Sequence, residues 1–533
     1  MAAEKPVVVV GAGVAGLAAA ATLAGAGVPV RVLEAATAPG GKMRQVMVAG
    51  RAIDAGPTVL TWRDVFEELF AAAGARLQDH LTLHRADILA RHAWSEDERL
   101  DLHADLARSA DAIGRFAGAA EAQRFLRFAA EARRIHDVLE ASYMRATRPN
   151  VLQLVQRVGL RGLPALARIR PFARLWGALG DHFRDPRLRQ LYGRYSTYCG
   201  SSPFLAPATL MLIAHVEQQG VWFVDGGMHA LARALEAVAA ARGAQFTYGA
   251  RVAEVLVAGG RASGVRLADG ETIDARAVIC NAELAAVADG LLGPVAARAV
   301  PRPQPALRSL SAVTWCAVAR TRGFALERHN VFFSRDYEAE FAALDRARTI
   351  PPDPTVYLCA QDRPQADGAE TERIFLLINA PADGDRRPWT AADVQQAAER
   401  SRATLARCGL ELEPLAQTAS TPGDFVRLFP GNGGALYGSA THGWRSSFTR
   451  PGACTRLPGF YMVGGSVHPG PGVPMAALSG RLAAAEVLDW SGQRRRTNSH
   501  GAGPHPRPSP ADAGEGSKPS PASAGEGASE ASG

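Results

Sequence analysis

The chain has 533 residues, 47% of them apolar and 21% charged. This is ordinary for a globular protein with a large core and excludes a small disulfide-stabilised scaffold. The six cysteines form no Cys-x-x-Cys pair, so we expect no metal site and no disulfide framework, as in a reducing cytosol. The net charge is +7, and residues 141–180 alone carry seven arginines and no acid. Because the rest of the chain is balanced, we expect no nucleic-acid partner.

The N-terminal segment has the composition of a targeting sequence. Lys5 precedes an uncharged run over residues 6–30, as in a signal peptide or a membrane span. The run nevertheless divides into a strand (Val7–Val10), a glycine-rich turn, an Ala-rich helix (Leu17–Ala24) and a second strand (Pro29–Leu33). This order predicts a nucleotide-binding unit. No other uncharged run of that length follows, so we expect that the chain does not cross a membrane.

The turn has the spacing Gly11-x-Gly13-x-x-Gly16, which is typical of dinucleotide binding. Gly11 permits the tight turn, Gly13 lets the backbone approach a pyrophosphate, and Gly16 lets helix and strand pack closely. The amides of the first helical turn, including that of Ala15, favour a phosphate. Glu34 ends the second strand and can accept hydrogen bonds from a ribose diol. The motif therefore predicts FAD or NAD rather than NADP.

Two following segments favour FAD over NAD. The segment Pro39–Arg44 would bring two glycine amides and a cation to the cofactor, an element typical of flavoproteins and absent from NAD-only dehydrogenases. The turn Asp54–Thr58 could bring a backbone N–H and a hydroxyl to the flavin. We therefore predict FAD, with contacts from these two segments by Gly40, Gly41, Lys42, Arg44, Gly56, Pro57 and Thr58.

The remaining elements are predicted from periodicity and turn signals. Residues 64–180 are predicted to be mostly helical, on apolar spacings such as Leu102 with Leu106. Later elements are predicted, in chain order, at Met228–Ala241 (helix), Arg251–Val257, Ala262–Leu267 and Glu271–Cys280 (strands), 311–333, 355–360 and 373–380 (strands of a second sheet), Phe460–Val463 (strand) and from about Met475 (helix). Residues 491–533 are rich in Pro, Ser, Gly, Ala and Glu and are predicted to be disordered.

Further blocks rich in glycine, proline and aromatic residues lie at Tyr198–Pro203, Gly220–Phe223, Gly226–Met228, Val278–Ala282, Gly431–Pro451 and Phe460–Pro474. With these blocks in this order, residues 6–490 resemble the bacterial carotenoid desaturase family, whose best-known members are phytoene desaturases. Finer features resemble its 1-hydroxycarotenoid 3,4-desaturase branch, the hydroxyneurosporene or methoxyneurosporene desaturases. These features are Gly40–Arg44, Ala90–Trp94, Leu100–Leu102 and Pro474-Met475.

The resemblance implies an α/β fold: a discontinuous Rossmann-like FAD-binding domain with an inserted mixed-sheet substrate domain and a helical membrane-contact region. The FAD-binding domain is expected to comprise three separate segments, 1–85, 216–300 and 431–490. Between them we expect a helical substrate and membrane region over 86–215 and a substrate-binding sheet domain over 301–430. The disordered tail is expected over 491–533.

The implied activity is FAD-dependent 3,4-desaturation of acyclic 1-hydroxycarotenoids, such as 1-hydroxyneurosporene, by hydride transfer to flavin in carotenoid biosynthesis. An allylic hydride can leave because the remaining cation spreads over the polyene, so the protein mainly positions the substrate and excludes water. No conventional catalytic residue is identified. His468 is a candidate proton acceptor, and orientation of its loop is the alternative role. The resemblance also implies FAD contacts from Val252, Asn281, Gly465, Val473 and Met475.

Other functions stay open at this point. A phytoene desaturase or a flavin-dependent carotenoid isomerase would carry the same motifs. A prenyl-lipid carrier of this fold would lack flavin, which the complete glycine motifs argue against. An amine oxidase usually presents an aromatic cage or a flavin-linked cysteine, and neither is identifiable.

The implied substrate dissolves in membranes, so the enzyme must reach a bilayer. Residues 141–180 combine arginines with apolar residues in a pattern suited to an anionic lipid surface. These apolar residues are Leu160, Leu163, Leu166, Ile169, Phe172, Leu175 and Trp176. The alternative is an ordinary helix whose apolar face packs on the core. We expect a cytoplasmic enzyme peripherally associated with the inner or photosynthetic membrane, with oxygen or a quinone as electron acceptor.

Overall fold

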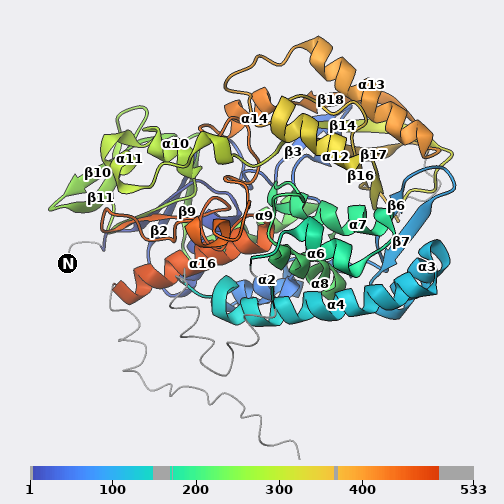
Figure 1. Cartoon of the computed structure of the whole chain (residues 1–533). Coiled ribbons are helices and arrows are strands. Elements are labelled where there is room, and N and C mark those ends of the chain that lie inside the picture. Colours follow the sequence, from blue (N-terminus) through green and yellow to red (C-terminus); the bar gives the residue numbers. More distant parts are fainter. Residues whose placement is uncertain (1–3, 148–168, 171, 365–369, 491–533) are drawn as a thin grey trace, which may run out of the picture. The chain divides into compact units, whose positions relative to one another are not determined.

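The computed structural model describes residues 4–147, 169–170, 172–364 and 370–490 (Figure 1). The predicted disordered tail lies outside the described residues, as do Leu160, Leu163 and Leu166. Contacts divide the chain into two units, Met1–Val487 and Leu488–Gly533. All the sheets lie in the first unit.

A five-stranded parallel sheet collects strands from the beginning, middle and end of the chain, in the order β19-β13-β1-β2-β9. Its strands are β1 (Val7–Val10), β2 (Val30–Glu34), β9 (Gln245–Tyr248), β13 (Ala277–Cys280) and β19 (Phe460–Met462). The central strand is four buried valines, as expected for a parallel strand covered on both faces. The predicted strands at both ends of the chain therefore meet in one sheet.

Four helices pack on or beside this sheet. They are α1 (Val14–Gly25), α2 (Arg63–Ala72), α9 (Met228–Ala241) and α16 (Val473–Trp490). Of these, α1, α9 and α16 are rich in alanine. Nine of the twelve residues of α1 are buried, because a helix that is apolar on all sides is stable only when neighbours surround it. The predicted helix over Met228–Ala241 has those bounds in the structure.

An antiparallel three-stranded sheet packs beside the parallel sheet with two short helices. Its members are β10 (Val252–Ala258), β11 (Arg261–Leu267) and β12 (Thr272–Asp274), and the helices are α10 (Leu284–Ala288) and α11 (Gly293–Ala299). The predicted single strand Glu271–Cys280 was wrong. It is two strands, β12 and β13, which belong to different sheets.

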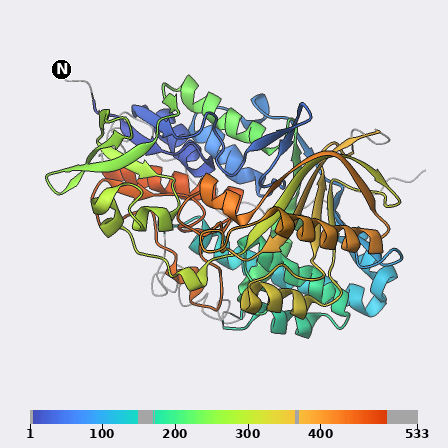
Figure 2. The ribbon, with the colours of Figure 1, turned by 90° about the horizontal axis from the view of Figure 1, so that it is seen from above.

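A seven-stranded mixed sheet has the order β18-β14-β17-β16-β15-β6-β7, with β15 and β6 parallel and the other neighbours antiparallel. Its strands are β6 (Ile88–Ala93), β7 (Arg99–His103), β14 (Ser311–Arg322), β15 (His329–Phe332), β16 (Val356–Ala360), β17 (Glu372–Ala380) and β18 (Glu411–Ser420). The long helix α13 (Ala391–Arg407) lies along this sheet (Figure 2). The predicted second sheet is confirmed, but its predicted segment 311–333 forms two strands, β14 and β15, which are not neighbours in the sheet.

The prediction of mostly helical structure over residues 64–180 was wrong for residues 83–103, which form β5 (Leu83–Arg85), β6 and β7. Leu100 and Leu102 are buried and alternate with less buried neighbours, which is the period of a strand. The spacing from Leu102 to Leu106 joins the end of a strand to the start of a helix.

Further helices form a layer below the mixed sheet in Figure 1. They are α3 (Leu106–Ala117), α4 (Ala119–Leu139), α6 (Leu175–His182), α7 (Pro186–Gly193) and α8 (Leu212–Gln219). Shorter helices and two-stranded ribbons complete the described structure: α12 (Tyr337–Ala342), α14 (Pro422–Leu428), α15 (Ser446–Thr449), β3 (Gln45–Val48), β4 (Arg51–Asp54) and β8 (Trp222–Val224). Among the described residues, no helix combines the length and the apolar character needed to span a bilayer.

Candidate cofactor and substrate site

The glycine-rich turn between β1 and α1 has the geometry that its sequence predicts. Gly11 has φ +96°, which favours glycine. A Cβ atom at Gly16 would lie 2.1 Å from the carbonyl oxygen of Gly11, so only glycine fits there. Gly13 precedes α1 and has no side chain to cap it, so the first amides of the helix, including that of Ala15, point beyond its N-terminus. This cradle fits a pyrophosphate.

Glu34 reaches back to this turn from the carboxyl end of β2. Its Oε2 accepts a hydrogen bond from the N–H of Ala12 at 2.6 Å, and its Oε1 accepts one from the N–H of Ala36 at 2.8 Å. These bonds hold the carboxylate beside the glycine-rich turn. The predicted acid and the predicted turn are therefore neighbours in the structure.

Asn281 joins the turn to the C-terminal region of the chain. It follows β13, and a Cβ atom at Gly13 would lie 2.6 Å from its side-chain amide. With its carboxamide oxygen facing the turn, Asn281 accepts hydrogen bonds from the N–H groups of Gly13 and Gly16, each at 3.2 Å. A Cβ atom at Gly464 would lie 2.9 Å from the same side chain. Asn281 therefore holds the shape of the turn itself.

The second glycine segment packs directly on the first. Gly40 pairs with Gly13 as an isolated β-bridge, and a Cβ atom at Gly41 would lie 3.3 Å from the Cα of Gly13. The Nζ of Lys42 donates a hydrogen bond to the carbonyl oxygen of Leu436 at 2.8 Å. The structure thus brings Gly40 and Gly41 to the turn, whereas the Nζ of Lys42 is held by Leu436 and lies 3.6 Å from a carboxylate oxygen of Glu283.

Arg44 points elsewhere. Its guanidinium donates to Ser420 Oγ at 3.1 Å, at the end of β18, and burial lowers its pKa. Gly56 packs on the same loop, since a Cβ atom there would lie 1.8 Å from the carbonyl oxygen of Lys42. Gly56 and Pro57 are partly accessible, so this turn leaves backbone available beside Lys42.

The side chain of Thr58 faces the mixed sheet. Its Oγ1 lies 2.6 Å from the hydroxyl of Tyr357 on β16, and that hydroxyl lies 2.7 Å from Nδ1 of His329 on β15. Burial lowers the pKa of His329 to about 3, because desolvation disfavours the charged imidazolium. This chain of three polar side chains links the Asp54–Thr58 turn to the sheet.

The predicted C-terminal contacts lie at the start of α16 and in the loop before it. Val473 begins the helix and Met475 lies in its first turn, while the carbonyl oxygen of Gly465 accepts a hydrogen bond from the buried guanidinium of Arg450 at 3.1 Å. Val252 is buried at the start of β10. The residues just before β10 contact the end of β2, because the N–H of Ala250 donates a hydrogen bond to the carbonyl oxygen of Glu34.

His468 is buried and its Nε2 faces two backbone carbonyls, those of Tyr143 at 3.1 Å and Ala146 at 3.0 Å. Since carbonyl oxygens only accept, Nε2 must carry the proton and donate it. The imidazole also lies edge-on to the Tyr143 ring, with centroids 4.8 Å apart. Its Nε2 therefore ties the C-terminal loop to the segment that follows α4.

A buried polar cluster was missed by sequence reasoning. Burial raises the pKa of Tyr198, the carboxylate of Glu217 raises it further, and the guanidinium of Arg194 lowers it. That guanidinium lies 5.5 Å from the ring centroids of both Tyr198 and Tyr357. Burial raises the pKa of Tyr198 and Tyr357, yet the two tyrosines and Arg194 keep part of their surface accessible. The surrounding residues therefore leave Tyr198, Tyr357 and Arg194 partly open to solvent.

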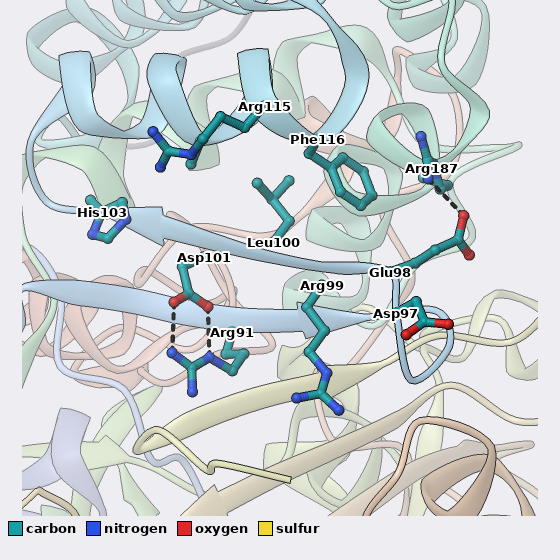
Figure 3. A pocket seen from close by; sticks show the side chains of 11 residues that line it. Arg91, Asp97, Glu98, Arg99, Leu100, Asp101, His103, Arg115, Phe116 and Arg187 are labelled. Atoms are coloured by element: carbon teal, nitrogen blue, oxygen red, sulfur yellow. Dashed lines mark hydrogen bonds and ion pairs between the residues drawn. The ribbon is translucent and has the colours of Figure 1, made fainter.

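A separate cavity lies at the edge of the mixed sheet, between β7 and α3. Its volume is about 630 Å³, and most of its lining side chains are those of arginine, aspartate or glutamate (Figure 3). Arg91 binds Asp101 with two hydrogen bonds of 2.7 Å, and Arg187 binds Glu98 at 2.7 Å. Its lining includes no residue of the glycine segments, so we do not assign the cofactor to it.

The sequence profile of a family described as flavin containing amine oxidoreductase matches residues 14–488. The hydroxyneurosporene desaturase of Rubrivivax gelatinosus is 55% identical over 92% of this chain and 95% of its own length. The protein of the same name from Cereibacter sphaeroides is 44% identical over 92% and 99%. The zeta-carotene-forming phytoene desaturase of Myxococcus xanthus is more distant, at 32% identity over 96% and 98%.

Solved structures with a similar fold are more remote in sequence. A putrescine oxidase variant matches with a TM-score of 0.57 at 15% identity, covering 91% of this chain and 99% of the oxidase. An oxidoreductase from Methanosarcina mazei matches with a TM-score of 0.56 at 19% identity, covering 91% and 100%. At such identities the likeness concerns the fold alone.

Proposed function

This chain belongs to the flavin-containing amine oxidoreductase family, and within that family we propose that it is an FAD-dependent desaturase of acyclic 1-hydroxycarotenoids. Its α/β fold and its FAD cofactor are those predicted from the sequence. The substrate proposal is supported by 55% identity, over nearly the whole chain, to a hydroxyneurosporene desaturase. The position of the new double bond, C3–C4, belongs to the proposal.

The observation that carries the proposal is the convergence of three segments on Asn281: the turn at Gly13 and Gly16, the end of β13, and the loop at Gly464. A dinucleotide cofactor needs such a glycine cradle at a helix N-terminus. We propose that the predicted cofactor contacts bind FAD, except the side chains of Arg44, which is engaged with Ser420, and of Thr58, which faces Tyr357. We also propose the division into FAD-binding, helical and sheet domains given above, except that residues 88–103 belong with the sheet domain, because β6 and β7 are strands of the mixed sheet.

FAD supplies the acceptor for a hydride from the substrate. The protein's own residues hold the cofactor, orient the polyene and exclude water, which is sufficient when the cofactor carries the difficult step. Tyr357 is partly accessible and lies beside the turn that ends at Thr58, so its ring offers an apolar face for the polyene.

His468 is assigned a positioning role in this proposal. Its Nε2 donates to the carbonyl oxygens of Tyr143 and Ala146, so that nitrogen has no lone pair with which to take a proton from substrate. The loop that it fixes leads into α16, where Val473 and Met475 are proposed to meet the flavin.

We further propose that the enzyme acts from a membrane surface. Three large apolar side chains that are exposed gather near the start of α6: Phe172 is 72%, Trp444 38% and Leu205 36% exposed. The rings of Phe172 and Trp444 lie 5.2 Å apart, and the carbonyl oxygen of Leu205 accepts from the N–H of Gly443. Exposed apolar side chains beside a basic segment are typical of peripheral membrane contact.

Within the same segment, Ile169 and Leu175 are buried. This burial favours ordinary core packing for these two residues, so the proposed membrane contact depends on Phe172. Among the described residues of this segment, Phe172 favours membrane contact, whereas Ile169 and Leu175 favour core packing. A cytoplasmic location at the inner or photosynthetic membrane, and oxygen or a quinone as electron acceptor, complete the proposal.

The test is desaturation by flavin-loaded protein in liposomes that contain either phytoene or 1-hydroxyneurosporene, each with a quinone or oxygen. Each added conjugated double bond shifts the polyene absorption to longer wavelength. We expect a shift with the hydroxylated substrate only. A shift with phytoene would indicate a phytoene desaturase instead, and conversion without any acceptor would indicate an isomerase.

A further inference from the structure

We propose that the hydroxyl of Thr58, held by Tyr357 and His329, recognises the oxygen at the hydroxylated end of the carotenoid. This inference rests on the proposed function, in which the C3–C4 bond lies against the flavin. The substrate oxygen sits on C1, two carbons from C3. Its protein partner must therefore lie immediately beside the flavin, on a cofactor segment rather than at a remote pocket.

Thr58 meets this requirement by its place in the chain. It ends the Asp54–Thr58 turn, which packs on the segment of Gly41 and Lys42 that in turn touches Gly13. Its side chain is turned from that segment toward Tyr357 on β16. Thr58 thus lies at the junction between the cofactor segments and the sheet, and it remains partly accessible.

The hydrogen-bond chain leaves Thr58 one proton to donate. His329 is neutral, because burial lowers its pKa to about 3, so only one of its nitrogens carries a hydrogen. Its Nε2 is buried and has no hydrogen-bond partner among the described residues. Buried N–H groups without an acceptor are rarer than buried acceptors without a donor, so the hydrogen is assigned to Nδ1.

The remaining directions follow from this assignment. Nδ1–H of His329 donates to the Tyr357 oxygen, 2.7 Å away, and the Tyr357 hydroxyl donates to Thr58 Oγ1, 2.6 Å away. The hydroxyl hydrogen of Thr58 is then free for a substrate oxygen. A hydrocarbon end in the same place would leave that hydrogen without an acceptor, which is the costly mismatch by which a polar site rejects an apolar analogue.

Arg194 supports the same site electrostatically. Its guanidinium lies 5.5 Å from the Tyr357 ring, and after burial and the charge of Arg328, its positive charge helps to keep His329 neutral by lowering its pKa. Arg194 stays charged and His329 stays neutral, so the hydrogen-bond chain of Thr58, Tyr357 and His329 keeps one protonation state. The hydroxyl of Thr58 thus keeps a constant orientation over the ordinary pH range.

The test compares binding and turnover of two polyenes, 1-hydroxyneurosporene and neurosporene, by the flavin-loaded enzyme in liposomes. Binding is followed by quenching of flavin fluorescence, so it does not depend on reaction. We expect wild type to bind the hydroxylated polyene at least about tenfold more tightly. Thr58→Val should remove most of this preference, Thr58→Ser should retain it, and Tyr357→Phe should reduce it by less than Thr58→Val, since Thr58 keeps its hydroxyl.

The matched control is Tyr192→Phe, a buried tyrosine in the core whose hydroxyl has no hydrogen-bond partner among the described residues. It should leave the preference unchanged. A Thr58→Val enzyme that binds FAD and keeps the wild-type preference would overturn the proposal, as would a wild type with no preference. If wild type binds the hydroxylated polyene selectively through Thr58 but desaturates neither polyene, the proposed function fails while the recognition site stands.

Discussion

A Cβ atom on Gly480 would lie 2.1 Å from the carbonyl oxygen of Ala15, so helix α16 crosses α1 with backbone against backbone. This contact joins the last described helix to the helix that begins at the glycine-rich turn. Because Val473 and Met475 lie at the start of α16, the contact sets the distance between the two ends of the proposed cofactor site.

Gly480→Ala tests this contact. The added methyl must push α16 away from α1, which for an overpacked core costs roughly 1–3 kcal/mol of unfolding free energy, and we expect weaker retention of FAD as well. Chemical denaturation and the visible absorbance of bound flavin measure the two effects. The control is Gly177→Ala in α6, where a Cβ atom would meet nothing within 4 Å. That change should be neutral or slightly stabilising, and a Gly480→Ala protein equal to wild type would contradict the packing argument.

Asn281→Asp separates the shape of the glycine-rich turn from its charge. An aspartate can accept the same hydrogen bonds from the N–H groups of Gly13 and Gly16, so we expect the protein to fold with nearly unchanged stability. Its negative charge would repel the pyrophosphate, so FAD affinity should fall and should partly recover as salt screens the repulsion. Flavin titration at low and high ionic strength measures this. Loss of affinity that is independent of salt would argue against an electrostatic cause.

The N-terminal unit could be predicted because its signals are local. Val7–Val10 has the predicted bounds, and Gly11 and Gly16 lie where a tight turn and a close approach require glycine. The uncharged run at the N-terminus was also correctly interpreted as strand, turn and helix. In each case the residues that determine the structure lie within a few positions of one another.

The hydrogen-bond chain of Thr58, Tyr357 and His329 could not be predicted from the sequence, because it depends on which strands pair in the mixed sheet. Thr58 and Tyr357 are 299 positions apart, and Tyr357 meets His329 only through the register of β15 with β16. In the sequence, Tyr357 and His329 lie in segments that are predicted to be strands, and both look like core residues. The same limit explains β6 and β7, because no local pattern indicates that β6 pairs with the distant strand β15 and carries β7 on its other edge.

The proposed membrane face is tested by the double variant Phe172→Ser and Trp444→Ser. Burying one aromatic side chain contributes about 1.5–3 kcal/mol, so we expect its association with anionic liposomes to fall by at least about tenfold. Co-sedimentation of the flavin-loaded protein measures it. Met47→Ser is the control, because Met47 is 64% exposed and lies on β3. Equal loss in both proteins, or no loss in the double variant, would contradict a membrane face at Phe172.

The pH dependence of stability offers a test of the buried acid Glu340 on α12. Its carboxylate accepts from the hydroxyls of Ser334 and Thr355, both at 2.7 Å, and burial raises its pKa from 4.5 to about 7. The folded protein therefore keeps a proton that the unfolded chain releases above pH 4.5. The stability contributed by this proton is fully present below pH 4.5 and is lost as the pH rises through about 7.

Glu340→Gln removes this titration. Between about pH 4.5 and 7, the wild type should lose up to ~1.4 kcal/mol of unfolding free energy per pH unit that the variant does not lose. Urea unfolding at pH 5 and pH 8 gives the difference in unfolding free energy between wild type and variant at each pH. Glu338→Gln, an exposed acid on the same helix, is the control and should follow the wild type. Parallel pH dependence in wild type and Glu340→Gln would show that Glu340 is already ionised at low pH and that Ser334 and Thr355 compensate its burial.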